Sequence, residues 1–126
     1  YNGKQIMSPE TVFRATLPTS TTNIDRTLLA PMRYALGPML GSNPVGIFGP
    51  MTGQAFGHLG FSNILCWADP ERDISVSILN TGKAVVGTHI PALAQTLYQI
   101  SSQCPKIPKT QRRALFGTDR TETELV

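Results

Sequence analysis

The chain has 126 residues, 40% of them hydrophobic and 15% charged, with a formal net charge of +3, 11 glycines and 10 prolines. This length gives one domain at most, with a single core. No apolar run approaches the roughly 18 residues of a membrane span, so the sequence excludes a transmembrane protein and also a collagen-like or fully disordered chain.

The chain begins at Tyr1 without the basic region and apolar core of a signal peptide, so we expect a piece of a longer chain or one processed upstream.

One helix is predicted near the N-terminus. Ser8 can cap a helix whose first residue is Pro9, and Glu10 suits the positive end of its dipole. This helix should end near Thr16. Residues 18–27 are predicted as a loop, residues 33–36 as a short strand, and residues 41–53 as turns.

The clearest pattern lies between residues 54 and 80. Residues 55–61 and 63–68 are apolar, and residues 74–78 alternate strictly between β-branched side chains and serine. Asp69 and Pro70 favour a type I turn between the last two segments. Together these features predict an antiparallel meander of three strands.

A second helix should begin at Pro91 and present one apolar face, made by Leu93, Leu97 and Ile100, to the sheet. Residues 1–103 are therefore expected to form an α+β unit, an antiparallel β-sheet covered by helices. Residues 104–126 are expected to be a basic, proline-containing tail, with five basic and three acidic residues and at most a short helix at 110–115. Leu115 and Phe116 are too few anchors to order this tail in isolation, so truncation after Gln103 should change the melting temperature little.

Most chemical motifs are absent. Cys66 and Cys104 are too few and too scattered for a disulfide framework or a metal knuckle, and one bridge between them stays open as the alternative to two free thiols. Cys66 is expected to be a small buried side chain. The compartment is left open, with a slight preference for a reducing, cytoplasmic one. His58 and His89 have no partner at metal-ligand spacing, and no phosphate-binding loop is present. We expect no cofactor and no metal, and the basic tail is weak evidence for nucleic acid because it carries acids and no interleaved aromatics.

The remaining candidate is a histidine bracketed by glycines on the first strand of the meander. Glycine inside a strand often marks a place where a ligand or another backbone comes close. Strand alternation puts His58 and Gly60 on one face, and Leu59 and Phe61 on the other, facing the core. His58 would then stand over a surface left clear by Gly60. The alternative is a surface histidine beside a glycine needed for packing.

Three runs in this region resemble the C-terminal part of the serine β-lactamase and penicillin-binding-protein-like family, nearest to its β-lactamase-related esterases and peptidases. They are Phe56-Gly57-His58-Leu59-Gly60-Phe61, Cys66-Trp67-Ala68-Asp69-Pro70-Glu71 and Ser75-Val76-Ser77-Ile78-Leu79-Asn80. His58-Leu59-Gly60 matches the His-x-Gly form of the family's third motif, which lies on the strand that lines the active site. The resemblance covers about residues 8–102 and implies the C-terminal part of a β-lactamase/transpeptidase-like fold.

Two family motifs are missing. No serine has a lysine three residues later, and no tyrosine or serine has an asparagine two positions on, so the nucleophile motif and the second proton-relay motif are absent. The resemblance therefore implies one wall of an acyl-enzyme site that hydrolyses an ester, amide or β-lactam. This chain alone is not expected to be active.

The resemblance also implies three residue roles. His58 would hold the substrate's carboxylate or acyl oxygen and assist proton transfer. Gly60 would keep the strand face clear for the acyl group, and the backbone N–H of Phe61 would be one of two oxyanion-hole donors. The implied partners are a small-molecule acyl substrate and the rest of the hydrolase, either as an N-terminal portion or as a second chain. Two other functions stay open, a non-catalytic binding or regulatory module and a basic-tailed nucleic-acid binder.

Overall fold

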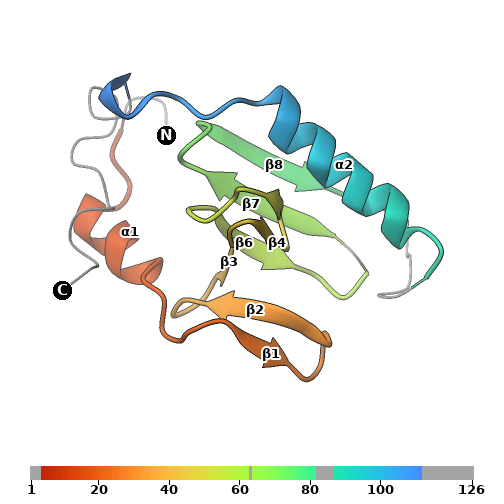
Figure 1. Cartoon of the computed structure of the whole chain (residues 1–126). Coiled ribbons are helices and arrows are strands. Elements are labelled where there is room, and N and C mark those ends of the chain that lie inside the picture. Colours follow the sequence, from red (N-terminus) through yellow and green to blue (C-terminus); the bar gives the residue numbers. More distant parts are fainter. Residues whose placement is uncertain (1–3, 63, 82–86, 112–126) are drawn as a thin grey trace.

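The computed structural model describes residues 4–62, 64–81 and 87–111, which form an α+β fold (Figure 1). An antiparallel sheet runs in the order β1-β2-β3-β6-β7-β8, and β4 pairs with β5 in a separate small hairpin. The helices are α1 (Pro9–Ala15) and α2 (Ile90–Gln103). The strands are β1 (Asn23–Asp25), β2 (Ala30–Tyr34), β3 (Met39–Leu40), β4 (Val45–Gly46), β5 (Gly49–Pro50), β6 (Phe56–Leu59), β7 (Leu65–Asp69) and β8 (Ile74–Ile78). Within the described ranges, no helix is long and apolar enough to cross a membrane.

Helix α1 begins where the sequence predicts. The Ser8 hydroxyl accepts a hydrogen bond from the backbone N–H of Thr11 at 3.1 Å, and Pro9 occupies the first turn. The Arg14 guanidinium donates to the Glu10 carboxylate one helical turn away, at 2.6 Å. All three features favour a helix start at this point, and the predicted helix is confirmed.

The β1–β2 hairpin differs from the sequence prediction, which placed a loop at residues 18–27 and a strand at 33–36. Asp25 closes the hairpin, because its Oδ1 accepts the N–H groups of Thr27 and Leu28 at 2.8 and 2.9 Å. The Tyr34 hydroxyl donates to Asp25 Oδ2 at 2.6 Å and ties β2 to β1. Polar residues thus form this hairpin through side-chain bonds to the backbone, which hydrophobic periodicity does not detect.

The three-stranded meander of β6, β7 and β8 is confirmed. Strand β7 pairs with β6 through Gly57 opposite Trp67, and with β8 through Trp67 opposite Val76. A β-turn forms at the predicted residues between β7 and β8, since the Arg72 N–H donates to the Asp69 carbonyl at 3.1 Å. Alternation places Trp67 and Leu65 in the core and turns Cys66 outward, so the expectation that Cys66 is buried is wrong.

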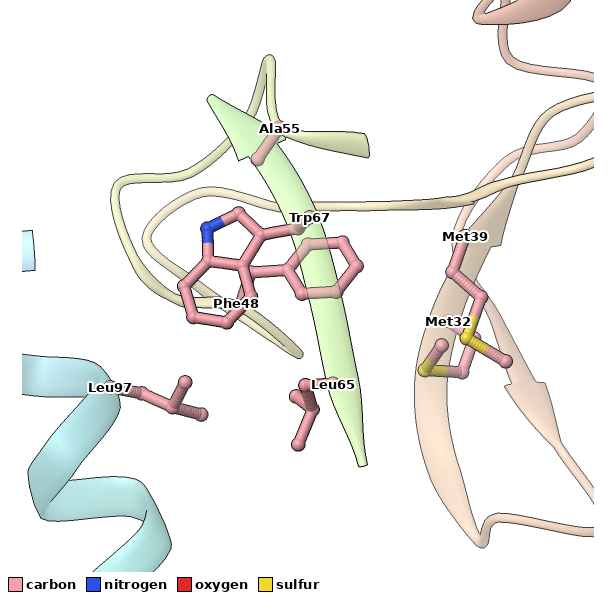
Figure 2. Packing of buried hydrophobic residues seen from close by; sticks show 7 residues of the cluster. All are labelled: Met32, Met39, Phe48, Ala55, Leu65, Trp67 and Leu97. Carbon is pink, nitrogen blue, oxygen red and sulfur yellow. The ribbon is translucent and has the colours of Figure 1, made fainter. Parts of the chain in front are cut away.

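The core lies between the meander and α2, and the segment between β3 and β6 fills it. Phe48 is fully buried and stacks on Trp67, with ring centroids 5.5 Å apart and planes 16° apart (Figure 2). Leu97 approaches the same cluster from α2 (Figure 2). Gly49 has φ +105°, and a Cβ there would meet the Leu97 carbonyl oxygen at 3.0 Å, so glycine permits the close approach of β5 and α2.

A buried ion pair joins the β7–β8 turn to the rest of the fold. Arg72 donates to the Asp69 carboxylate at 2.6 Å, and also to the carbonyl oxygens of Met51 at 3.0 Å and Cys104 at 2.9 Å.

The segment after α2 is bound to the same turn. The Ile107 N–H donates to the Glu71 carbonyl at 2.8 Å, and Lys106 pairs with the Glu71 carboxylate. Residues 104–107 form no helix or strand, in line with the prediction, but they lie against the β7–β8 turn. The proposed anchors Leu115 and Phe116 lie outside the described residues.

Candidate functional site

His58 lies on β6, in the interior of the sheet between β3 and β7. Its side chain is exposed, and it forms no hydrogen bond or ion pair within the described part of the chain. Strand β3 is short, and on β6 it pairs with Phe56 and Gly57 alone among the described residues, so the β3 side of β6 is not covered by that strand from His58 onward. The predicted outward position of His58 is confirmed.

The outward face around His58 carries no charged side chain on the described parts of β6, β7 and β8. Directly opposite His58 lies Cys66, and opposite Cys66 lies Ser77, so these three residues form one row across the sheet. All three side chains are exposed, and the Cys66 thiol is free. Side chains directly opposite each other in an antiparallel pair have Cβ atoms about 5 Å apart. The imidazole is thus flanked by a thiol and by small or apolar neighbours.

The backbone at the end of β6 presents its N–H groups in opposite directions. The Gly60 N–H donates to the Ile64 carbonyl at 2.7 Å and so points to β7. The Leu59 N–H points the other way, to the Met39 sulfur at 3.3 Å. This is the alternation of an antiparallel strand.

Phe61 differs from its predicted position. Strand β6 ends at Leu59, and Phe61 lies in the following turn with 88% of its side chain exposed, so it does not face the core. The Asn80 side chain donates to the Ser62 carbonyl at 2.8 Å and fastens this turn to the end of β8. The turn breaks the alternation on which the prediction for Phe61 depended. Leu59, by contrast, packs against the core as expected.

The two glycines that flank His58 have different surroundings. A Cβ on Gly57 would lie 2.1 Å from the Cys66 carbonyl oxygen and 2.5 Å from the Trp67 Cα, so the packing requires glycine there. A Cβ on Gly60 would lie 3.3 Å from the Ile64 carbonyl oxygen and 3.6 Å from its Cβ, a tight contact that a small shift relieves. The packing therefore accounts for a glycine at position 57, whereas it does not by itself require one at position 60.

No family model matches the chain, and no curated protein and no solved structure matches it either. The chemistry of the site is thus argued from its residues alone. No group of three or more potential metal ligands (His, Cys, Asp or Glu) occurs within the described ranges. An exposed imidazole beside a clear strand face can donate a hydrogen bond to an anionic or carbonyl oxygen and act as a general acid or base toward it.

Other polar features of the molecule have structural roles. A hollow of about 30 Å³ lies beside Thr16, Arg33 and Gln54, which is space for a water molecule rather than an acyl substrate. The hydrogen bond from Tyr34 lowers the pKa of Asp25, and the same bond raises the pKa of Tyr34 to about 12. Both residues close the β1–β2 hairpin.

The sequence prediction missed Cys66 as a neighbour of His58. The alternation of residues 65–69 indicates that Cys66 points away from the core, on the same face as His58.

Proposed function

We propose that this chain is the C-terminal portion of a β-lactamase-related serine hydrolase and supplies the His-x-Gly wall of its acyl-enzyme site. The substrate class is an ester, an amide or a β-lactam. The nucleophilic serine and its lysine base belong to the rest of the hydrolase, either as an upstream portion or as a second chain, because no Ser-x-x-Lys occurs in these 126 residues.

The observation that supports this proposal best is the exposed His58 imidazole on an interior strand, without a partner in the described part of the fold. A histidine that serves packing would be buried or hydrogen-bonded by its neighbours. His58 instead stands on a face that carries no charged side chain on the described parts of β6, β7 and β8, where it can donate a hydrogen bond to a substrate oxygen or accept a proton from the reacting group. If His58 has that role, removal of its side chain lowers the catalytic rate and leaves the stability of the fold nearly unchanged.

Gly60 and Phe61 have supporting roles in the proposed site. Gly60 has no side chain on the same face as His58, so a planar acyl group can approach the strand closely. Phe61 contributes its backbone N–H, one of two donors that stabilise the developing oxyanion, while the other donor comes from the nucleophilic serine. Loss of one such donor costs about 3 kcal/mol in the transition state. The exposed Phe61 ring then faces the acyl group or the rest of the hydrolase.

The experiment is an acylation assay read by intact-protein mass spectrometry, with a β-lactam or an activated ester as the reagent. The chain alone should gain no serine-linked acyl group, because it lacks the nucleophile and base. The complete hydrolase should gain one acyl group on the serine of its Ser-x-x-Lys motif. A stoichiometric serine adduct on the chain alone contradicts the proposal, and a complete protein without such a motif favours a non-catalytic binding module instead.

A further inference from the structure

Arg33 is a half-buried cation on β2 that has no acidic partner in the described part of the chain. Its Nη1 donates to the Gly41 carbonyl at 2.9 Å, and its other guanidinium N–H groups bind no group of the described residues. By contrast, Arg14 and Arg72 each pair with a carboxylate. A charge that is partly removed from water requires hydrogen bonds from water or from an anion to offset its desolvation.

Arg33 lines a hollow of about 30 Å³ in which a second donor also lacks a partner. Leu40 lies directly opposite Arg33 in the β2–β3 pair, is buried and lines the same hollow. Gln54 is half-buried there, and its amide has no hydrogen-bond partner within the described ranges. The described residues that line the hollow include no acid. A cation and an amide donor thus meet at one small space without a counter-charge.

Backbone hydrogen bonds hold the walls of this hollow in place. The Thr19 N–H and hydroxyl both donate to the Tyr34 carbonyl, at 2.9 and 3.1 Å, and fasten the segment after α1 to β2. The Gly41 N–H donates to the Ala55 carbonyl at 2.8 Å, which fixes the chain next to Gln54. Because both walls are fastened, a ligand in the hollow pays little to order them.

The end of α1 reaches the hollow at Thr16 but does not occupy the guanidinium. Basic side chains near the end of a helix often bind its last carbonyl groups. Here the Thr16 N–H donates to the carbonyls of Val12 and Phe13 at 3.1 and 3.2 Å, and Arg33 donates to neither. The Thr16 hydroxyl also donates to Val12, at 2.8 Å, so it supplies no donor to the hollow.

We propose that this hollow is a binding site for a carboxylate group, held by the Arg33 guanidinium and the Gln54 amide. One oxygen atom the size of a water molecule needs about 10–15 Å³, so a hollow of about 30 Å³ accepts the two oxygens of a carboxylate but not the four of phosphate. The planar fork of a guanidinium also matches a planar carboxylate. The carboxylate belongs to a free small molecule or to an acidic side chain of the rest of the hydrolase.

The test is a titration of the 126-residue chain with sodium acetate, and separately with phosphate, followed by ¹H–¹⁵N NMR at constant ionic strength. Acetate should shift the amide signals of Gly53, Gln54 and Ala55 saturably, with a dissociation constant in the millimolar range, and phosphate should not. Arg33→Gln should weaken acetate binding at least about tenfold. Arg26→Gln removes the same charge at an exposed position and should bind acetate like the unmodified chain.

Two further variants keep the proposal testable if Arg33→Gln does not fold, which its own spectrum shows. Arg33→Lys keeps the charge without the planar fork, and Gln54→Ala removes the amide donor, so each should bind acetate more weakly than the unmodified chain. A response to acetate that stays linear into the molar range contradicts the proposal and leaves Arg33 to water. Equal affinity in the Arg33 variants, or binding of phosphate as tight as that of acetate, contradicts it as well.

The same titration of the complete hydrolase distinguishes the two sources of the carboxylate. Acetate binding equal to that of the chain alone indicates a free small molecule as the ligand. Loss of acetate binding there indicates that an acidic side chain of the remaining protein fills the hollow. Binding of acetate to the chain alone does not depend on the role of His58, which is tested separately.

Discussion

Arg72 and Asp69 form an ion pair in which both side chains are almost fully buried, with 5% and 1% of their surfaces exposed and 2.6 Å between Nη1 and Oδ2. The guanidinium also donates to the carbonyl oxygens of Met51 and Cys104, so a single side chain joins the β7–β8 turn, the loop after β5 and the end of α2. The pair matters less for its Coulomb energy than for the carbonyl groups that it satisfies.

Arg72→Met should therefore lower the free energy of unfolding by about 3–5 kcal/mol. It removes the cation beside the buried Asp69 carboxylate, which keeps only the hydrogen bond from the Glu71 N–H within the described part of the chain, and it takes the Arg72 donor away from the Met51 and Cys104 carbonyls. Urea denaturation measures this loss. Arg14→Met is the matched control, since its pair with Glu10 is exposed and contributes about 0.5 kcal/mol or less. Equal effects of the two substitutions would show that burial does not govern the Arg72 pair.

The two glycines beside His58 should respond differently to alanine. Gly57→Ala should cost about 1–3 kcal/mol of stability, because its Cβ would overlap the Cys66 carbonyl and Trp67. Gly60→Ala should cost about 1 kcal/mol or less, because only a small shift of Ile64 is needed. Thermal unfolding measures both. A larger loss for Gly60→Ala than for Gly57→Ala would mean that the fold, and not the site, requires Gly60.

Tyr34 should ionise near pH 12, later than an ordinary tyrosine, because its hydroxyl donates to the Asp25 carboxylate. The pKa is raised on folding, so the stabilisation from this bond is fully present below about pH 10 and is lost as the pH rises through about 12. Absorbance at alkaline pH measures the ionisation. Tyr34→Phe should remove the last ionisation step, and an unchanged titration curve would contradict the assignment.

The same bond and the bonds from the Thr27 and Leu28 N–H groups lower the pKa of Asp25. Its contribution to stability should be present above the usual pKa of 3.8 and should fall as the pH drops through the lower folded value. Asp25→Asn should therefore flatten this part of the acid-unfolding curve. A curve of unchanged shape would show that the hairpin does not depend on the charge of Asp25.

The segment after α2 divides into two parts with different expected effects. Truncation after Lys109 keeps the Ile107 and Lys106 bonds to Glu71 and should leave the melting temperature nearly unchanged. Truncation after Gln103 removes the Cys104 carbonyl that Arg72 binds, and should lower stability by about 1–3 kcal/mol. Calorimetry of both truncated chains measures the difference. The earlier expectation of a small effect for truncation after Gln103 depended on apolar anchors alone and omitted these polar bonds.

Sequence patterns predicted the elements whose local signals agree. Ser8 and Pro9 begin α1, Pro91 and its apolar spacing indicate α2, and the alternation of residues 74–78 indicates β8. These signals lie within a few residues of one another. The outward orientation of His58 also followed from alternation, because Leu59 and Trp67 fix the core side of the sheet.

Features that depend on distant contacts were not predictable in this way. Phe48 lies in a stretch for which the sequence predicts only turns, yet it is a core residue, because the fold stacks it on Trp67 in the same buried cluster as Leu97. In the sequence, Asp69 and Arg72 look like ordinary turn residues. Only the fold brings the end of α2 and the loop after β5 against them and buries the pair. The position of Phe61 depended on where β6 ends, and the turn at Gly60 ends it earlier than hydrophobicity suggests.

The most direct test of the proposed function is kcat/KM of the complete hydrolase on an activated ester, compared between the unmodified protein and His58→Ala. Cys66→Ala is the matched control, because Cys66 is exposed on the same face directly opposite His58. We expect His58→Ala to lower kcat/KM by about 100-fold or more, with little change in melting temperature, and Cys66→Ala to lower it only slightly. A value within about twofold of the unmodified protein, in a folded His58→Ala variant, would contradict the account, since proton transfer and positioning normally contribute far more than that.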